Sequence, residues 1–105
     1  MKPVKAGGCI PPQHPALPGH FPGTPVVPGV VLLDEVARAA QQALGTALEL
    51  DAIPDTKFHA PLSPGEKFVS TLEPVDAVSV TFVVTRGDTR IASGTMRFRM
   101  RADTS

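Results

Sequence analysis

The sequence contains neither tryptophan nor tyrosine, which disfavours an aromatic stacking platform. Its single cysteine, Cys9, excludes an internal disulfide and is typical of a protein in a reducing cytoplasm. Ten basic and ten acidic residues cancel, whereas nucleic-acid-binding domains usually carry a basic excess. No apolar run approaches the roughly 18 residues of a membrane span, and no apolar segment follows Lys2 and Lys5. We therefore expect no membrane span, no secretion signal and no nucleic-acid partner.

A chain of 105 residues is expected to form one domain, residues 1–105. A domain this small buries a modest share of its surface, so association with another chain would stabilise it. Seven of the 12 prolines fall between Pro11 and Pro28. That composition also suits a flexible linker, but apolar residues are interspersed and the segment leads directly into an apolar helix. We interpret it as an ordered, rigid loop.

The only strong helix signal covers residues 29–44, between Pro28-Gly29 and Gly45. We expect its first turn to be deeply buried because residues 30–33 are all apolar. A helical wheel places one apolar stripe on Val30, Leu33, Ala37, Ala40 and Leu44.

The rest of the chain has patterns typical of β-strands. Residues 4–10 give a weak first strand, and residues 48–53 and 57–62 suggest one long strand interrupted near Pro54. Residues 63–65 predict a turn, and Gly87-Asp88 predicts a hairpin tip. Alternating apolar and polar residues from Phe68 onward indicate an antiparallel sheet with one covered face. The predicted class is α+β, a sheet wrapped around one central helix.

Candidate catalytic residues gather where the proline-rich loop meets the helix. His20 lies in the stiff loop, and imidazole suits a general base because its pKa lies near neutrality. Free N–H groups at residues 29–31 begin the helix and could bind an oxygen that gains negative charge, with bare Gly29 allowing close approach. Asp34 and Glu35 are candidate acids, and apolar neighbours favour a desolvated, protonated Asp34. Each of these features also has an ordinary structural interpretation, and the wheel prefers Asp34 over Glu35 only weakly.

The segment HFPGTPVVPGVVLLD resembles the signature of the FabA/FabZ family of 3-hydroxyacyl-(acyl-carrier-protein) dehydratases, which have the hotdog fold. The family pattern is close to H-F-P-G-x-P-x-x-P-G, with an acidic residue five positions after the last glycine. A second segment, KFHAPLSPGEKF, resembles the family more weakly, so the likeness covers most of the chain from about Pro15. Short members of this kind resemble accessory dehydratases of pathways such as aryl polyene biosynthesis.

The resemblance implies a dimeric hotdog enzyme that dehydrates a 3-hydroxyacyl thioester on an acyl carrier protein, without metal or organic cofactor. His20 would be the base, Asp34 of the other subunit the acid, and the Gly29 N–H the donor to the thioester carbonyl. We expect Phe21 and Val30 to contact the substrate as well. The partner would be a second copy or another hotdog protein, and the setting fatty-acid or polyene-type biosynthesis in the cytoplasm.

Two other functions stay open: an accessory hotdog subunit that binds acyl chains without catalysis, and a hotdog thioesterase. A row of arginines on the last strand, Arg97, Arg99 and Arg101, with Arg86 and Arg90 nearby, fits either a carrier-docking patch or an ordinary solvated strand face. His59, in a predicted strand, is interpreted as an exposed surface residue.

Overall fold

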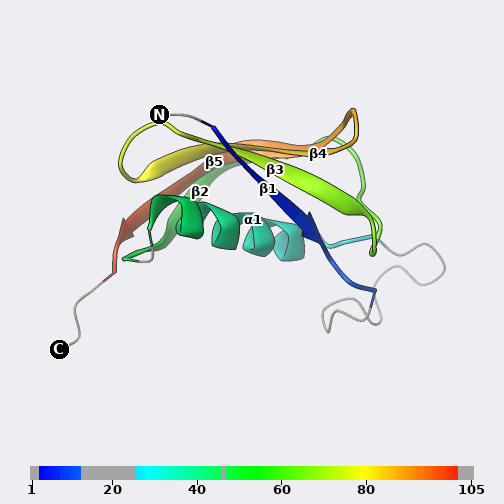
Figure 1. The fold of residues 1–105 in the computed structure, drawn as a ribbon, viewed down its shortest axis with the longest axis horizontal. Coiled ribbons are helices and arrows are strands. Elements are labelled where there is room, and N and C mark those ends of the chain that lie inside the picture. Colours follow the sequence, from blue (N-terminus) through cyan, green and yellow to red (C-terminus); the bar gives the residue numbers. More distant parts are fainter. Residues whose placement is uncertain (1–2, 13–25, 46, 102–105) are drawn as a thin grey trace.

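One helix lies under a curved five-stranded antiparallel sheet in the computed structural model, which describes residues 3–12, 26–45 and 47–101 (Figure 1). The strand order is β1-β3-β4-β5-β2, so β1 and β2 form the two edges. This arrangement confirms the predicted α+β class with one central helix. The elements are β1 (Val4–Cys9), α1 (Gly29–Leu44), β2 (Leu48–Phe58), β3 (Lys67–Pro74), β4 (Ser79–Arg86) and β5 (Thr89–Met100).

Helix α1 begins and ends at the predicted residues. Pro28 occupies the N-cap with φ −59° and contributes no N–H, so it costs the helix no hydrogen bond. Gly45 follows the last turn with φ 127°, a conformation that disfavours other residues, and its N–H donates to the carbonyl of Gln41 over 2.7 Å. Within the described ranges, no helix is long and apolar enough to cross a membrane.

The predicted burial of the helix is confirmed in part, because Ala37 and Ala40 of the expected apolar stripe are buried and Leu33 and Leu44 pack against the core. The first turn is not buried all round, because Val30 is 76% exposed and Leu33 is only partly buried. Four apolar residues in succession leave the direction of the buried face undetermined. The sheet settles it, since the side that packs against the sheet carries Val31, Leu32, Val36, Ala37 and Ala40.

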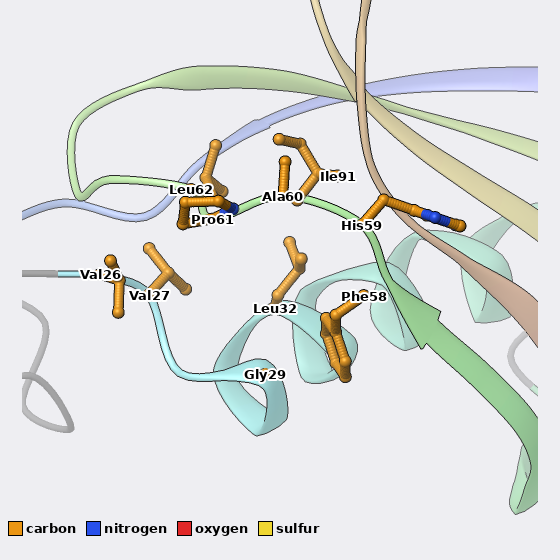
Figure 2. A pocket seen from close by; sticks show the side chains of 10 residues that line it. All are labelled: Val26, Val27, Gly29, Leu32, Phe58, His59, Ala60, Pro61, Leu62 and Ile91. Atoms are coloured by element: carbon orange, nitrogen blue, oxygen red, sulfur yellow. The ribbon is translucent and has the colours of Figure 1, made fainter.

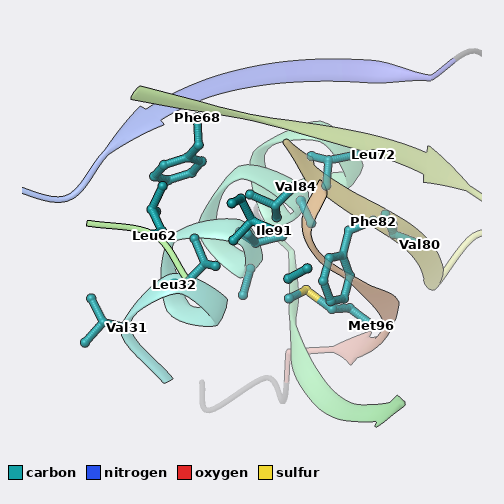
Figure 3. Close-up of a cluster of buried hydrophobic side chains, with 14 of the residues drawn as sticks. Val31, Leu32, Leu62, Phe68, Leu72, Val80, Phe82, Val84, Ile91 and Met96 are labelled. Atoms are coloured by element: carbon teal, nitrogen blue, oxygen red, sulfur yellow. The ribbon is translucent and has the colours of Figure 1, made fainter. Parts of the chain in front are cut away.

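The inner face of the sheet supplies most of the rest of the core (Figure 3), and residues outside the strands add Ile10, Val27 and Leu62. The predicted alternation holds in β3 and β4, whereas in β5 the consecutive residues Ile91 and Ala92 are both buried. Ser70, 2% exposed, is the one buried polar residue in the part of the chain described. Met100, at the end of β5, is exposed although the alternation predicts it on the inner face. The buried apolar residues of the strands are Leu48, Phe68, Leu72, Val80, Phe82, Val84, Ile91, Ala92, Met96 and Phe98.

Strand β2 differs from its prediction at both its middle and its end. It continues through Pro54 without a break and stops at Phe58, so residues 59–62 leave the sheet. Its pairing with β5 shifts twice, between Leu50 and Asp55. A Cβ added at Gly94 of β5 would meet the backbone oxygen of Asp55, so only glycine lets the two strands approach this closely there.

Candidate functional site

Two backbone N–H groups at the start of α1 have no hydrogen bond to the residues that the structure describes. The carbonyl of Pro28 accepts the N–H of Val31 over 3.0 Å and the N–H of Leu32 over 3.2 Å. The expectation of a free donor at Val31 was therefore wrong. For the N–H groups of Gly29 and Val30, no hydrogen bond is found among the described residues. Because they sit at the positive end of the helix dipole, they suit an oxygen that becomes negative during a reaction.

Backbone hydrogen bonds fix the chain on both sides of this helix start. The N–H of Val27 donates to the carbonyl of Leu62 over 2.7 Å, which ties the segment before α1 to the segment after β2. The N–H of His59 donates to the carbonyl of Ile91 over 2.8 Å, which ties that same segment to β5. The donors at Gly29 and Val30 are therefore presented from a rigid frame.

A pocket of about 410 Å³ opens beside Gly29 and is predominantly apolar (Figure 2). It lies between the start of α1, the end of β2 and the start of β5. An apolar pocket with few polar groups at one end is typical of a site for a ligand with an apolar chain and one reactive head. The lining residues are Val26, Val27, Gly29, Leu32, Phe58, His59, Ala60, Pro61, Leu62 and Ile91.

Phe58 occupies the space that the missing side chain of Gly29 leaves. A Cβ built on Gly29 would lie 2.6 Å from Cζ of Phe58, far inside van der Waals contact. The expectation that this space admits the substrate was therefore incomplete, because the phenyl ring already fills the side facing β2. Glycine at this position is required by packing, and the ring itself stays 54% exposed.

Asp34 lies in a second, shallower groove of about 230 Å³ with Val30, Leu33, Leu50 and Ile53. Its neighbours are apolar, as expected, but its side chain is 60% exposed and its Oδ2 lies 2.9 Å from Nη2 of Arg38. In the single chain, the expected desolvation of this carboxyl is therefore absent. The groove runs between α1 and the edge strand β2, so whatever covers that edge would also cover Asp34.

Glu35, the other candidate acid, points to a different part of the molecule. It lines a polar cavity of about 240 Å³ between α1 and strands β1 and β3, together with Gln42 and Ser70. Its Oε1 lies 3.8 Å from Nη1 of Arg38. The two neighbouring carboxyls thus line different grooves while sharing Arg38, and only Asp34 lies in the groove along β2.

The predicted site residues are placed as follows. Gly29, Val30 and Asp34 all lie on α1, with Gly29 at the deep pocket and the other two in the groove along β2. His20 and Phe21 lie outside the described residues. Five residues separate Gly29 from Asp34, a rise of about 7.5 Å along the helix axis. Phe58 was missed, since nothing in its alternation with neighbours signals a contact with a glycine 29 positions earlier.

His59 is exposed, as predicted, and its ring points away from Leu32 and Phe58 (Figure 2). Its Nε2 lies 2.9 Å from Oγ of Ser93 on β5. His59 therefore contributes to the wall of the pocket without directing its imidazole into it.

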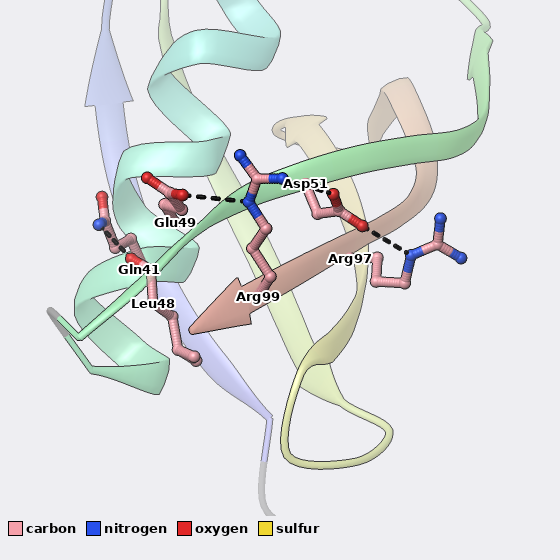
Figure 4. A network of polar contacts seen from close by, with 6 residues as sticks. All are labelled: Gln41, Leu48, Glu49, Asp51, Arg97 and Arg99. Atoms are coloured by element: carbon pink, nitrogen blue, oxygen red, sulfur yellow. Dashed lines mark hydrogen bonds and ion pairs between the residues drawn. The ribbon is translucent and has the colours of Figure 1, made fainter. Parts of the chain in front are cut away.

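The arginines of β5 are paired with carboxylates of the neighbouring strand β2 (Figure 4). Arg97 Nε lies 3.3 Å from Asp51, and Arg99 Nε lies 3.0 Å from Glu49. This local neutralisation favours a solvated strand face over a docking patch for these two residues.

Comparison with known proteins identifies dehydratases as relatives of this chain. Residues 2–95 match the ApeI-like family, described as ApeI dehydratase. The chain is 32% identical over 83 residues to a 3-hydroxyacyl-(acyl-carrier-protein) dehydratase FabZ of Cereibacter sphaeroides, a match that covers 79% of this chain and 53% of the relative. The chain thus spans about half the length of the curated relatives it matches.

Solved structures show the same fold. A chain of the dehydratase heterocomplex ApeI:P from Xenorhabdus doucetiae superposes with a TM-score of 0.78 at 25% identity, covering 96% of this chain and all of the other. A point mutant of the fluoroacetyl-CoA-specific thioesterase FlK superposes with a TM-score of 0.71 at 19% identity, covering 93% of this chain and 87% of the other. At that lower identity the likeness concerns the fold alone. The predicted hotdog fold is confirmed.

Proposed function

The chain belongs to the ApeI-like dehydratase family, and we propose that it removes water from a 3-hydroxyacyl thioester to give a trans-2-enoyl thioester. The observation that carries this proposal is the apolar pocket that opens at Gly29, whose backbone N–H has no hydrogen bond to the residues that the structure describes. Such a site holds an acyl chain in the pocket and the thioester carbonyl at the helix start. The FabZ dehydratase matched above acts, by its name, on a 3-hydroxyacyl group carried by acyl carrier protein.

Three residues divide the proposed chemistry. His20 takes the α-proton, and the electron pair left on the α-carbon forms the new double bond as the bond from carbon to the 3-hydroxyl breaks. Asp34 gives its proton to the departing hydroxyl, which leaves as water. The Gly29 N–H stabilises the negative charge that develops on the thioester oxygen. No metal or organic cofactor takes part in these steps.

The proposed acid comes from a second subunit. Asp34 faces the groove beside the edge strand β2, where the exposed apolar residues Val30 and Leu50 also lie. A hotdog partner that covers this edge would desolvate Asp34 and bring it toward the His20 loop of the other chain. The partner is a second copy or another hotdog protein, and the solved ApeI:P relative is a heterocomplex.

The proposed substrate is delivered by an acyl carrier protein during fatty-acid or polyene-type biosynthesis in the cytoplasm. Phe21 and Val30 are proposed to contact the acyl group.

The test is conversion of carrier-bound 3-hydroxyacyl thioesters of several chain lengths, followed by mass spectrometry of the carrier for loss of water. The chain is assayed alone and together with candidate hotdog partners. We expect His20→Ala and Asp34→Asn each to reduce turnover by about two orders of magnitude or more. Glu35→Gln is the matched control, because Glu35 lines a different cavity from the proposed site. A wild-type protein that is inert on every chain length and with every partner contradicts the proposal.

An accessory role without catalysis is the second candidate, supported by the heterocomplex among its solved relatives. If a complex that carries His20→Ala in this chain keeps full activity, this subunit serves its partner rather than the chemistry. Release of free thiol from the same substrates, with no enoyl product, would instead indicate a thioesterase.

A further inference from the structure

Phe58 has no role in the reaction proposed above, yet its ring lies against Gly29, whose N–H is the proposed donor to the carbonyl. Its Cζ, Cε1 and Cε2 atoms would stand 2.6 to 3.2 Å from a Cβ on Gly29, so the face of the glycine toward β2 is in contact with the ring. The ring also lines the pocket that begins there.

The backbone on both sides of Phe58 is held in place. Phe58 pairs with Ala92 in the β2–β5 ladder, and the next residue donates its N–H to the carbonyl of Ile91. The side chain reaches across from the last residue of β2 to the first turn of α1 (Figure 2). Since the backbones of the two elements are anchored independently, the ring extends from a fixed point toward the helix start.

Phe58 is nevertheless 54% exposed, so one side of this large apolar residue has no protein contact. Such exposure at the mouth of an apolar pocket fits a contact with a ligand. An acyl thioester whose carbonyl oxygen accepts the Gly29 N–H has its α-carbon one bond from the carbonyl carbon. With the carbonyl at Gly29, a substituent on that α-carbon would approach the Phe58 ring in the wall of the pocket.

We propose that Phe58 is a specificity-determining residue that admits acyl groups unbranched at the α-carbon and rejects those with an α-methyl group. This inference rests on the proposed function, because it assumes a thioester carbonyl at Gly29. The ring also keeps water from one side of that carbonyl, which strengthens the hydrogen bond from the helix start.

The first experiment tests the contact itself and needs no substrate. Gly29→Ala places a methyl group against the ring, so we expect it to lower the melting temperature in the wild-type background and to be tolerated in Phe58→Ala. Equal effects of Gly29→Ala in both backgrounds would show that the ring does not occupy this position in solution.

The second experiment measures selectivity. The ratio of kcat/KM for a linear 3-hydroxyacyl thioester over its 2-methyl counterpart is determined for the wild type, Phe58→Leu and Phe58→Ala. One methyl group in an apolar site is worth roughly 10- to 200-fold, so we expect a wild-type ratio of about tenfold or more. The ratio should fall to about twofold in Phe58→Ala and stay high in Phe58→Leu. Val75→Ala removes another exposed apolar side chain far along the sequence and is expected to leave the ratio unchanged.

Binding of unreactive amide analogues, linear and 2-methyl, separates this inference from the proposed function. If the wild type turns over no thioester but Phe58→Ala selectively gains affinity for the branched analogue, the dehydratase proposal fails and the role of Phe58 stands. Suppose instead that linear substrates are dehydrated and that Phe58→Ala changes neither the kcat/KM ratio nor the relative affinity for the two analogues. The role of Phe58 is then refuted and the dehydratase proposal stands.

Discussion

Asp34 and Arg38 lie one helical turn apart and form an ion pair, with Oδ2 of Asp34 2.9 Å from Nη2 of Arg38. Both side chains are largely exposed, and ion pairs of this kind contribute little to stability. The pairing therefore orients the proposed acid in the single chain rather than holding the fold together.

Replacing the carboxyl of Asp34 should separate catalysis from stability. We expect Asp34→Asn to lower the dehydration rate by about two orders of magnitude or more. Its free energy of unfolding should change by less than about 1 kcal/mol, because only an exposed pair is lost. Steady-state turnover and urea denaturation measure the two quantities. Glu35→Gln is the neighbouring control. A comparable loss of rate in that variant would show that Asp34 is not the specific acid.

Gly94 and Gly7 form a matched pair of strand glycines. A Cβ at Gly94 would meet the backbone oxygen of Asp55 and the ring of Phe82, whereas a Cβ at Gly7 meets nothing within 4 Å. We expect Gly94→Ala to cost about 1–3 kcal/mol or more, because β2 cannot shift without losing its pairing with β5. Gly7→Ala should be neutral or slightly stabilising. Thermal and urea unfolding of both variants provide the measurement, and equal stabilities would contradict the close approach of β2 to β5.

Val36 and Val30 test the orientation of the helix. Val36 is fully buried and Val30 is 76% exposed. Val36→Ala should cost about 2 kcal/mol of unfolding free energy, from lost apolar burial and the cavity left behind. Val30→Ala should cost less than about 0.5 kcal/mol in the unassociated chain. Should the two losses prove equal at a protein concentration low enough to prevent association, the assigned face of α1 would be wrong.

Glu66 gives stability a dependence on acid pH. Its carboxylate accepts the backbone N–H of Ser63 over 2.7 Å and lies 3.1 Å from Arg86 Nη1, and these contacts, the first above all, lower its pKa below the ordinary 4.5. A carboxyl whose pKa is lower in the folded state stabilises the fold fully above its unfolded-state pKa. That contribution is lost as pH falls through the folded-state value.

Urea unfolding between about pH 6 and pH 3 checks this dependence, since that interval brackets the ordinary pKa of a glutamate. Glu66→Gln should lose less stability on acidification than the wild type. Glu73→Gln, an exposed change on β3, is the control for lost charge. If the stabilities of Glu66→Gln and the wild type change in parallel with pH, the Glu66 carboxylate contributes nothing to the pH dependence of stability.

The sequence predicted those elements whose signals are local. Proline and glycine at the two ends of α1 fix its bounds, because one lacks an N–H and the other accepts a positive φ. Alternation in β3 and β4 likewise sets which side chains face the helix. The sequence motif around Gly29 and Asp34 was sufficient to place both residues on α1.

Features that depend on distant contacts could not be predicted. The uniformly apolar first turn of α1 left its buried side undecided until the sheet was in place. The end of β2 at Phe58 depends on hydrogen bonds from His59 and Ala60 to Ile91, and no local pattern shows these. The contact of Phe58 with Gly29 joins two elements that lie far apart in the sequence. Asp34 and Glu35 line different grooves because different strands pack beside each of them.

Strand β2 also affects whether further chains can add to the edge of the sheet. It is an edge of the sheet, and an edge strand is a template for addition of further strands without limit. Pro54 has no N–H to offer in the middle of this edge, and the shifted pairing between Leu50 and Asp55 interrupts its regular hydrogen-bonding pattern. Both features work against the addition of a long, regular ladder at this edge. The irregularity of β2 therefore disfavours open-ended growth of unassembled subunits through this strand.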